Sequence, residues 1–81
     1  PSSFGPSNQE DFKVESFTLG ADSYLTGKVL KDCSLADFQC MIISVLKGEE
    51  FITNPKADLR FEEGDTVWIA GNTASCNWLR K

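Results

Sequence analysis

The residues with most potential for chemistry are carboxylates that lie close together in the second half of the chain. Asp58, Glu62, Glu63 and Asp65 could offer oxygen ligands to a divalent cation such as Ca²⁺. Their spacing matches no cation-binding loop, however, and Glu-Glu-Gly-Asp is a common turn ahead of a strand. The sequence therefore favours a solvated acidic turn over a metal site.

Acid–base catalysis is the other chemistry that paired carboxylates could perform. Glu49 and Glu50 are adjacent, but neighbouring strand residues face opposite ways, and no positioned nucleophile accompanies them. The chain contains no His, which removes imidazole bases and the Ser-His and Cys-His pairs of many hydrolases. The sequence predicts a protein that is not an enzyme.

The cysteines predict neither a disulfide framework nor a zinc site. Cys33, Cys40 and Cys76 are odd in number and lack C-x-x-C spacing. We expect reduced thiols in the cytoplasm, with Cys40 and Cys76 as small core residues.

Charge and composition narrow the choice of partners. Eight Lys and Arg against twelve Asp and Glu give a formal net charge of -4, the wrong sign for a protein that binds a phosphate backbone. We therefore expect no nucleic acid partner. The 81 residues, 41% hydrophobic and 25% charged, are typical of one globular domain with a small core.

The chain divides into a linker and one domain. Residues 1–11 are rich in Pro, Gly and Ser, and cannot bury enough apolar surface to offset their ordering entropy. Residues 12–81 form the predicted domain. Because the chain begins at Pro1 without a signal-peptide pattern, we expect it to be a segment of a longer protein.

The first half of the domain is predicted to contain a strand and a short helix. Residues 11–19 favour a strand, in which Phe12 and Val14 have the opposite parity from Phe17 and Leu19. Such a change requires a bulge or cover on both faces. Residues 25–30 suggest a short helix with Thr26 as N-cap, whereas residues 34–38 could form a helical turn or a loop.

The second half is predicted to be mainly strands. The apolar run 40–46 suggests a central strand covered on both faces, and a turn then leads to a hairpin partner at 51–53. Residues 59–61 form a short half-buried stretch, 66–70 a last strand, and 74–79 a helix capped by Asn72 or Thr73. Trp78 could anchor an interface or pin this helix to the sheet. The predicted fold class is α+β, a small mixed or antiparallel sheet with two short helices in the order β-α-β-β-β-α.

Four segments together resemble the TrkA-C family, the C-terminal domain of regulators of potassium conductance. Residues 25–30 are similar to its L-x-G-K-x-L segment and residues 43–48 to V-x-I-x-R-G. Residues 52–58 resemble I-x-N-P-x-x-D, and residues 59–71 resemble L-x-x-G-D-x-L-x-V-x-G. The resemblance covers about residues 12 to 80.

The resemblance implies a regulatory domain that pairs with its own copy on the cytoplasmic side of potassium channels, cation/proton antiporters or related carriers. Some members bind cyclic di-AMP in the groove between two copies. The matching residues here, which the resemblance implies as ligand-binding, are Leu35, Asp37, Phe38, Gln39, Met41 and Ile42. Three of them, Phe38, Met41 and Ile42, are the implied dimer interface.

This stretch departs from the dinucleotide-binding members of the family. They usually carry a basic residue where Leu35 stands, and a polar Asn or His near Met41. Because the phosphates would lack a cationic partner, we expect cyclic di-AMP to bind weakly or not at all. The identity of the ligand, and of any cofactor, stays open.

Two hypotheses follow from the sequence. The first is a non-catalytic, ligand-sensing domain of a membrane potassium or cation/proton transporter, acting as a homodimer whose two arrangements are shifted by the ligand. The alternative is a structural dimerisation module of that transporter with no small ligand.

Overall fold

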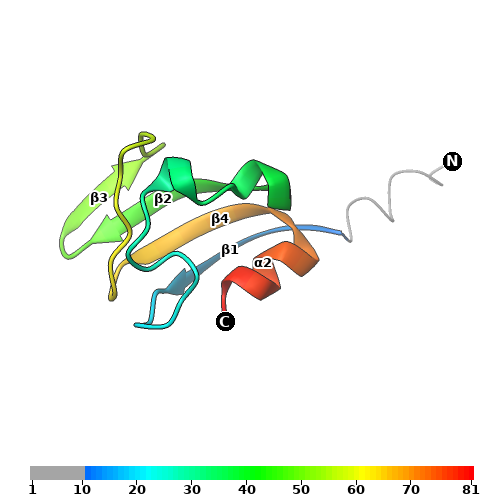
Figure 1. Ribbon diagram of the computed structural model, residues 1–81, viewed down its shortest axis with the longest axis horizontal. Coiled ribbons are helices and arrows are strands. Elements are labelled where there is room, and N and C mark those ends of the chain that lie inside the picture. The colour runs from blue at the N-terminus through cyan, green and yellow to red at the C-terminus, as the bar shows by residue number, and fades with distance from the viewer. Residues whose placement is uncertain (1–10) are drawn as a thin grey trace, which may run out of the picture.

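The protein folds as a four-stranded antiparallel sheet with its helical elements on one face, as a computed structural model of residues 11–81 shows (Figure 1). The strands run in the spatial order β1-β4-β2-β3. Their bounds are Phe12–Thr18 for β1, Cys40–Lys47 for β2, Glu50–Thr53 for β3 and Thr66–Asn72 for β4. The helical elements are the 3₁₀ turns η1 (Leu30–Asp32) and η2 (Leu35–Phe38) and the helix α2 (Thr73–Leu79). This architecture confirms the predicted α+β class.

The C-terminal helix forms as predicted. Asn72 is the N-cap of α2, and its side-chain Oδ1 accepts a hydrogen bond from the Ser75 backbone N–H at 3.2 Å. This bond satisfies one of the N–H groups that the first turn of a helix leaves unpaired. The helix buries Cys76 and Leu79 against the sheet.

The predicted helix at residues 25–30 is wrong. Gly27 has φ +88, and its backbone N–H donates to the Phe61 carbonyl at 2.8 Å. The Phe61 N–H donates in turn to the Lys28 carbonyl, and Val29 and Arg60 form an isolated antiparallel bridge. These bonds to a distant segment replace the local ones of a helix. Residues 59–61 contribute only this bridge and no strand of the sheet.

The first strand contains no bulge, although its apolar residues switch from even to odd positions along the chain. β1 pairs with β4 in continuous register from Phe12 to Thr18, with alternate residues exposed. Phe17 faces the core, as Leu19 does just beyond the strand, while Phe12 and Val14 face the uncovered side. The bulge lies instead in β2, where the register with β4 shifts between Ile42 and Ser44.

The central strand β2 is covered on one face only, so the predicted double cover is wrong. Ile42 and Val45 are buried in the core, but Met41 is 58% exposed. The register shift between Ile42 and Ser44 inserts one extra residue in β2. Ile42 and Val45 can therefore both point into the core although they are three positions apart, which contributes to the unbroken apolar run in the sequence. The uncovered face of the sheet therefore remains apolar.

A single core fills the space between the sheet, the helical elements and the long connections. Its largest fully buried side chains are Phe61, Leu19, Leu25, Ile69 and Leu79. Cys33, Cys40 and Cys76 are free thiols within the same core, so the core roles predicted for Cys40 and Cys76 are confirmed. Within residues 11–81, no helix is long and apolar enough to cross a bilayer. Of the predicted linker 1–11, residues 1–10 lie outside the described part.

Candidate functional site

The candidate ligand site is a pocket of about 260 Å³ at the start of β2. It lies where η2, β1 and the end of β4 meet. Its lining residues are Phe12, Ala36, Gln39, Cys40, Met41, Ala70 and Gly71. The sheet order brings these residues together, because β4 lies between β1 and β2. None of the lining residues is charged.

The pocket depends on a close approach of two backbones at Gly71. A Cβ there would lie 2.3 Å from the Gln39 carbonyl oxygen and 2.7 Å from the Cys40 Cα, and the φ of Gly71 is +154. Only glycine fits such a position without a shift of the backbone. The Gln39 carbonyl accepts a hydrogen bond from the Asn72 N–H at 3.0 Å, which holds the two strands in this arrangement.

The turn before β2 directs Gln39 outward. Gln39 has φ 62, in the left-handed region, and its N–H donates to the Ala36 carbonyl. Ser34, at the other end of η2, also has a positive φ of 56. Left-handed backbone at two non-glycine residues costs free energy, so η2 is held between two strained positions.

The structure separates the ligand-binding residues that the sequence implied. Gln39 and Met41 line the pocket, and Asp37 is exposed on η2. Leu35 and Ile42 are buried, at 7% and 6% exposure, and their side chains belong to the core. Phe38 is half-buried and packs against other aromatic rings.

Sequence reasoning missed five lining residues. Ala36 and Cys40 lie within the stretch that was considered, but no side-chain property singled them out. Phe12, Ala70 and Gly71 come from distant strands, and only the sheet order places them beside Met41. The signal that could have pointed to them is Gly71 at the end of an apolar strand, since such a glycine often marks a close backbone approach.

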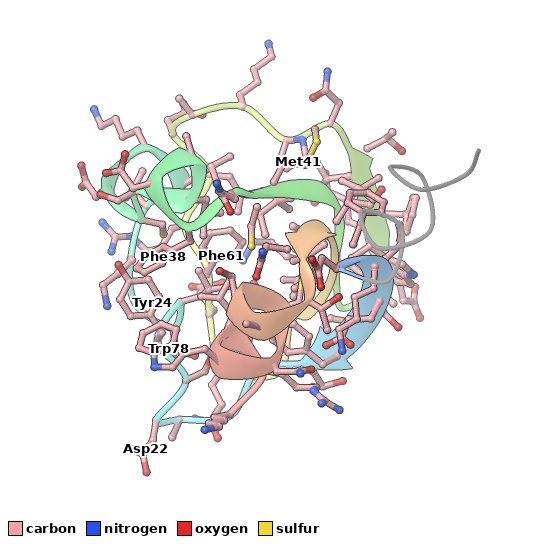
Figure 2. The ribbon with its side chains drawn as sticks, turned by 90° about the vertical axis from the view of Figure 1, so that its right-hand side faces the viewer. Asp22, Tyr24, Phe38, Met41, Phe61 and Trp78 are labelled. Atoms are coloured by element: carbon pink, nitrogen blue, oxygen red, sulfur yellow. The ribbon has the colours of Figure 1, made fainter. Side chains whose placement is uncertain are left out.

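Three aromatic rings tie the end of η2 to α2. Tyr24 contacts Trp78 with ring centroids 5.0 Å apart, and Phe38 stacks on Trp78 at 5.6 Å. Figure 2 shows these rings side by side, apart from Met41. Through these ring contacts Trp78 packs α2 against η2. The side chain is still 45% exposed, so part of the indole is accessible to solvent.

The acidic segment is a turn held by a lysine. The Asp65 carboxylate is buried, accepts from the Glu62 N–H at 2.9 Å, and lies 2.5 Å from the Lys47 Nζ. Burial disfavours the charged form of Lys47, but hydrogen bonds and charge from Asp65 and Glu62 outweigh it and raise the pKa of the ammonium. Within residues 11–81, no group of three or more His, Cys, Asp or Glu side chains could hold a metal ion.

The buried thiols are poorly suited to react as nucleophiles. Burial raises the pKa of Cys33, and it raises the pKa of Cys76 to about 11, with a further contribution from the neighbouring Cys40 thiol. Because the thiolate is the reactive form, such cysteines are inert at neutral pH.

Comparison with known proteins decides the family. The model of the TrkA-C domain matches residues 14–81. The chain belongs to the TrkA-C domain family. No curated protein matches it by sequence. Members of this family are regulatory domains, and the match covers every strand and helix of this TrkA-C domain except the first two residues of β1.

Solved structures share the fold. The chain is similar to the domain dimer of S. agalactiae BusR in complex with c-di-AMP, a regulator-of-conductance (RCK) C domain, with a TM-score of 0.68, 18% identity, and cover of 79% of this chain and 86% of that one. It is also similar to the RCK C domain of the potassium transport protein KtrA in complex with c-di-AMP, with a TM-score of 0.68, 19% identity, and cover of 89% and 84%. A third structure is S. agalactiae BusR with its busAB-promotor DNA, at 18% identity and a TM-score of 0.68, where the match covers 79% of this chain and 32% of that one.

Two predictions about partners are contradicted by these comparisons. The expectation that cyclic di-AMP binds weakly or not at all rested on Leu35, whereas two similar domains are complexes with that dinucleotide. The physical reason is that Leu35 is a core residue here, so the absence of a cation there says nothing about a ligand.

The expectation that the protein has no nucleic acid partner, which was inferred from its negative net charge, is also wrong. A BusR chain containing this fold is bound to promoter DNA. The matched domain makes up 32% of that chain, and the net charge of one domain does not fix what the whole chain binds.

Proposed function

We propose that this domain is the non-catalytic, ligand-sensing part of a regulator of a membrane potassium or cation/proton transporter, and that it acts in the cytoplasm as a homodimer. Family membership and the likeness to the KtrA domain support this proposal. In it, residues 12–81 are the regulatory domain and the residues before them are a connector. The observation that carries the proposal is the uncharged pocket between η2, β1 and β4.

The pocket suits a flat heterocycle. The Phe12 ring, the Met41 thioether and Ala70 offer an apolar surface, and Met adapts its shape to a bound aromatic ring. The Gln39 amide carries donors and an acceptor that can pair with the edge of an adenine base. Because no lining residue is charged, we propose that the bases enter the pocket and the phosphates lie toward solvent.

Cyclic di-AMP is the ligand that this arrangement favours. It carries two adenosine halves, and a two-fold dimer presents every pocket twice. We propose that one molecule places one base in the pocket of each subunit. A ligand that fits one relative orientation of the subunits better than another shifts their equilibrium, and the attached transporter responds to that shift.

The similarity to BusR supports a second candidate function. In a longer chain the same domain could report to a DNA-binding domain, as a BusR chain was captured with promoter DNA. The two candidates share the ligand site and differ in the domain that responds. Mobility-shift assays and transport assays on the full-length protein distinguish them, since each candidate expects ligand dependence in only one assay.

The proposal is tested by calorimetric titration of residues 1–81 with cyclic di-AMP, using ATP and AMP as comparison ligands. Ala36→Glu should weaken binding at least tenfold, because a carboxylate would fill the pocket and repel phosphate. Gln39→Asn keeps a residue that tolerates left-handed backbone but shortens the amide, and should weaken binding several-fold. Glu63 lies in the turn before β4, at the end of that strand far from Gly71, so Glu63→Gln should leave binding unchanged. Absence of binding by the unaltered domain would favour the structural dimerisation module.

A further inference from the structure

A second hollow lies between the loop that follows β1 and the C-terminal end of α2. Its volume is about 320 Å³, and its lining residues are Asp22, Tyr24, Trp78 and Lys81. None of these four residues lines the pocket at the start of β2. Figure 2 shows Tyr24 and Trp78 side by side, with Asp22 on the loop below them. We term this site the aromatic hollow.

The two rings of the aromatic hollow are fixed by their own contacts. Tyr24 and Trp78 meet with centroids 5.0 Å apart and planes at 62°, so they form a corner. Phe38 contacts both rings from within the domain, at 5.9 and 5.6 Å. The Tyr24 hydroxyl donates to the Cys33 carbonyl at 3.1 Å. The rings are therefore held in place before a ligand arrives, and such a site loses less entropy on binding.

A cation already lies on one ring of this cluster. The Lys28 ammonium is 4.2 Å from the centroid of Tyr24, and it donates to the Tyr24 carbonyl at 2.6 Å. Trp78 is 45% exposed, and no cation of the described residues lies over its indole. Indole attracts cations more strongly than the other aromatic side chains do. The accessible part of Trp78 can therefore take a cation from a ligand.

Two opposite charges line the same hollow without neutralising each other. The side chains of Asp22 and Lys81 are both exposed. Within residues 11–81, no ion pair includes either of them. A ligand that carries only one charge would be attracted by one side chain and repelled by the other. A ligand that carries both charges can complement both side chains.

The chemistry of the hollow favours a quaternary ammonium as the cationic group. Such a group has no N–H, so it needs no hydrogen-bond acceptor, and aromatic rings are its usual partners in proteins. A primary ammonium has three donors to satisfy, and a divalent metal ion takes six or more oxygen ligands. The lining supplies a single carboxylate, that of Asp22. A primary ammonium or a metal ion would therefore lose more hydration than this site replaces.

We propose that the aromatic hollow binds a small zwitterion that carries a quaternary ammonium and a carboxylate. The ammonium lies against Trp78 and Tyr24 beside Asp22, and the carboxylate faces Lys81. The site adds a second class of ligand to the domain, and it does not depend on cyclic di-AMP. We expect dissociation in the millimolar range, because the hollow is open and exposed charge pairs contribute little.

A heteronuclear NMR titration of the 81-residue chain with N,N,N-trimethylglycine tests this proposal. The indole N–H signal of Trp78 should shift and reach saturation. The indole signal of Trp68, which contacts Phe51 away from the hollow, should stay in place as an internal control. The comparison ligand is tert-butylacetate, which has the same shape and carboxylate but carbon in place of the charged nitrogen. It should bind at least tenfold more weakly.

Charge variants test the two ends of the site, and the same spectra check that each variant folds. Asp22→Asn should weaken trimethylglycine binding several-fold, whereas Asp58→Asn, an exposed change outside the hollow, should leave it unaltered. Lys81→Gln should weaken trimethylglycine but tighten choline, which has the same cation and no carboxylate. The absence of a Trp78 shift, equal binding of tert-butylacetate, or equal effects of the two Asp variants would overturn the proposal.

Discussion

The indole of Trp78 and the ring of Phe38 stack with their centroids 5.6 Å apart and their planes 20° apart. Phe38 is the last residue of η2, and the next residue, Gln39, lines the pocket. The stack therefore connects the wall of the candidate pocket to the C-terminal helix α2.

The first prediction concerns this stack. Trp78→Ala and Phe38→Leu should each lower the free energy of unfolding, and a double-mutant cycle should show a coupling of about 0.5–1.5 kcal/mol. Urea denaturation measures it. Additive effects of the two changes would show that the rings do not support each other.

The second prediction concerns the backbone contact at Gly71. Gly71→Ala should destabilise the domain by several kcal/mol, roughly 2–4, because its Cβ meets the Gln39 and Cys40 backbone. Gly20→Ala is the matched control, since nothing lies within 4 Å of a Cβ there, and it should change stability by less than about 0.5 kcal/mol. Equal melting temperatures for the two variants would contradict the described packing.

The third prediction concerns the buried carboxylate of the acidic turn. Asp65→Ala removes the acceptor for the Glu62 N–H and the partner of Lys47, and should cost about 1–3 kcal/mol. Glu62→Ala removes only an exposed ion pair with Lys47 and should cost less than about 1 kcal/mol. Added calcium should stabilise neither the unaltered protein nor the variants. A calcium-dependent rise in melting temperature would restore the metal interpretation of this turn.

The fourth prediction concerns alkaline pH. Burial raises the pKa of Cys76 to about 11, above the ordinary value of 9.0. Between these values the unfolded chain loses the thiol proton while the folded chain keeps it, so stability is present below pH 9 and is lost as pH rises toward 11. The loss should be roughly 1–3 kcal/mol.

Cys76→Ala isolates this effect. The variant should be less stable at pH 7, but its free energy of unfolding should fall less between pH 9 and 11 than that of the unaltered chain. Denaturation at several pH values measures both. Parallel pH profiles would show that Cys76 does not titrate differently in the two states.

The elements that local patterns determine were predictable. The strand at 40–46, its hairpin, the strand at 66–70 and the helix capped by Asn72 follow from β-branched runs, turn residues and a capping side chain. The family resemblance added the regulatory class, which the family match confirms. Each of these inferences depends on residues close together in the sequence.

What was not predictable depends on contacts between distant segments. Residues 25–30 have a helical pattern, yet Gly27 and Lys28 bond to Phe61 instead. The exposed parity of Phe12 and Val14 was visible in the sequence, but only the strand order shows that they share a face with Met41 and Phe51. Leu35 was interpreted as a missing ligand contact because the sequence does not reveal that it points into the core.

The stoichiometry of cyclic di-AMP binding tests the central claim most directly. In equilibrium dialysis of the 81-residue chain with labelled cyclic di-AMP, a two-fold ligand shared by two subunits should saturate at one molecule per two chains. Ala36→Glu should lower the affinity, because its carboxylate would fill the pocket. Saturation at one molecule per chain, or no binding at millimolar ligand, would contradict the account of a dimeric ligand sensor.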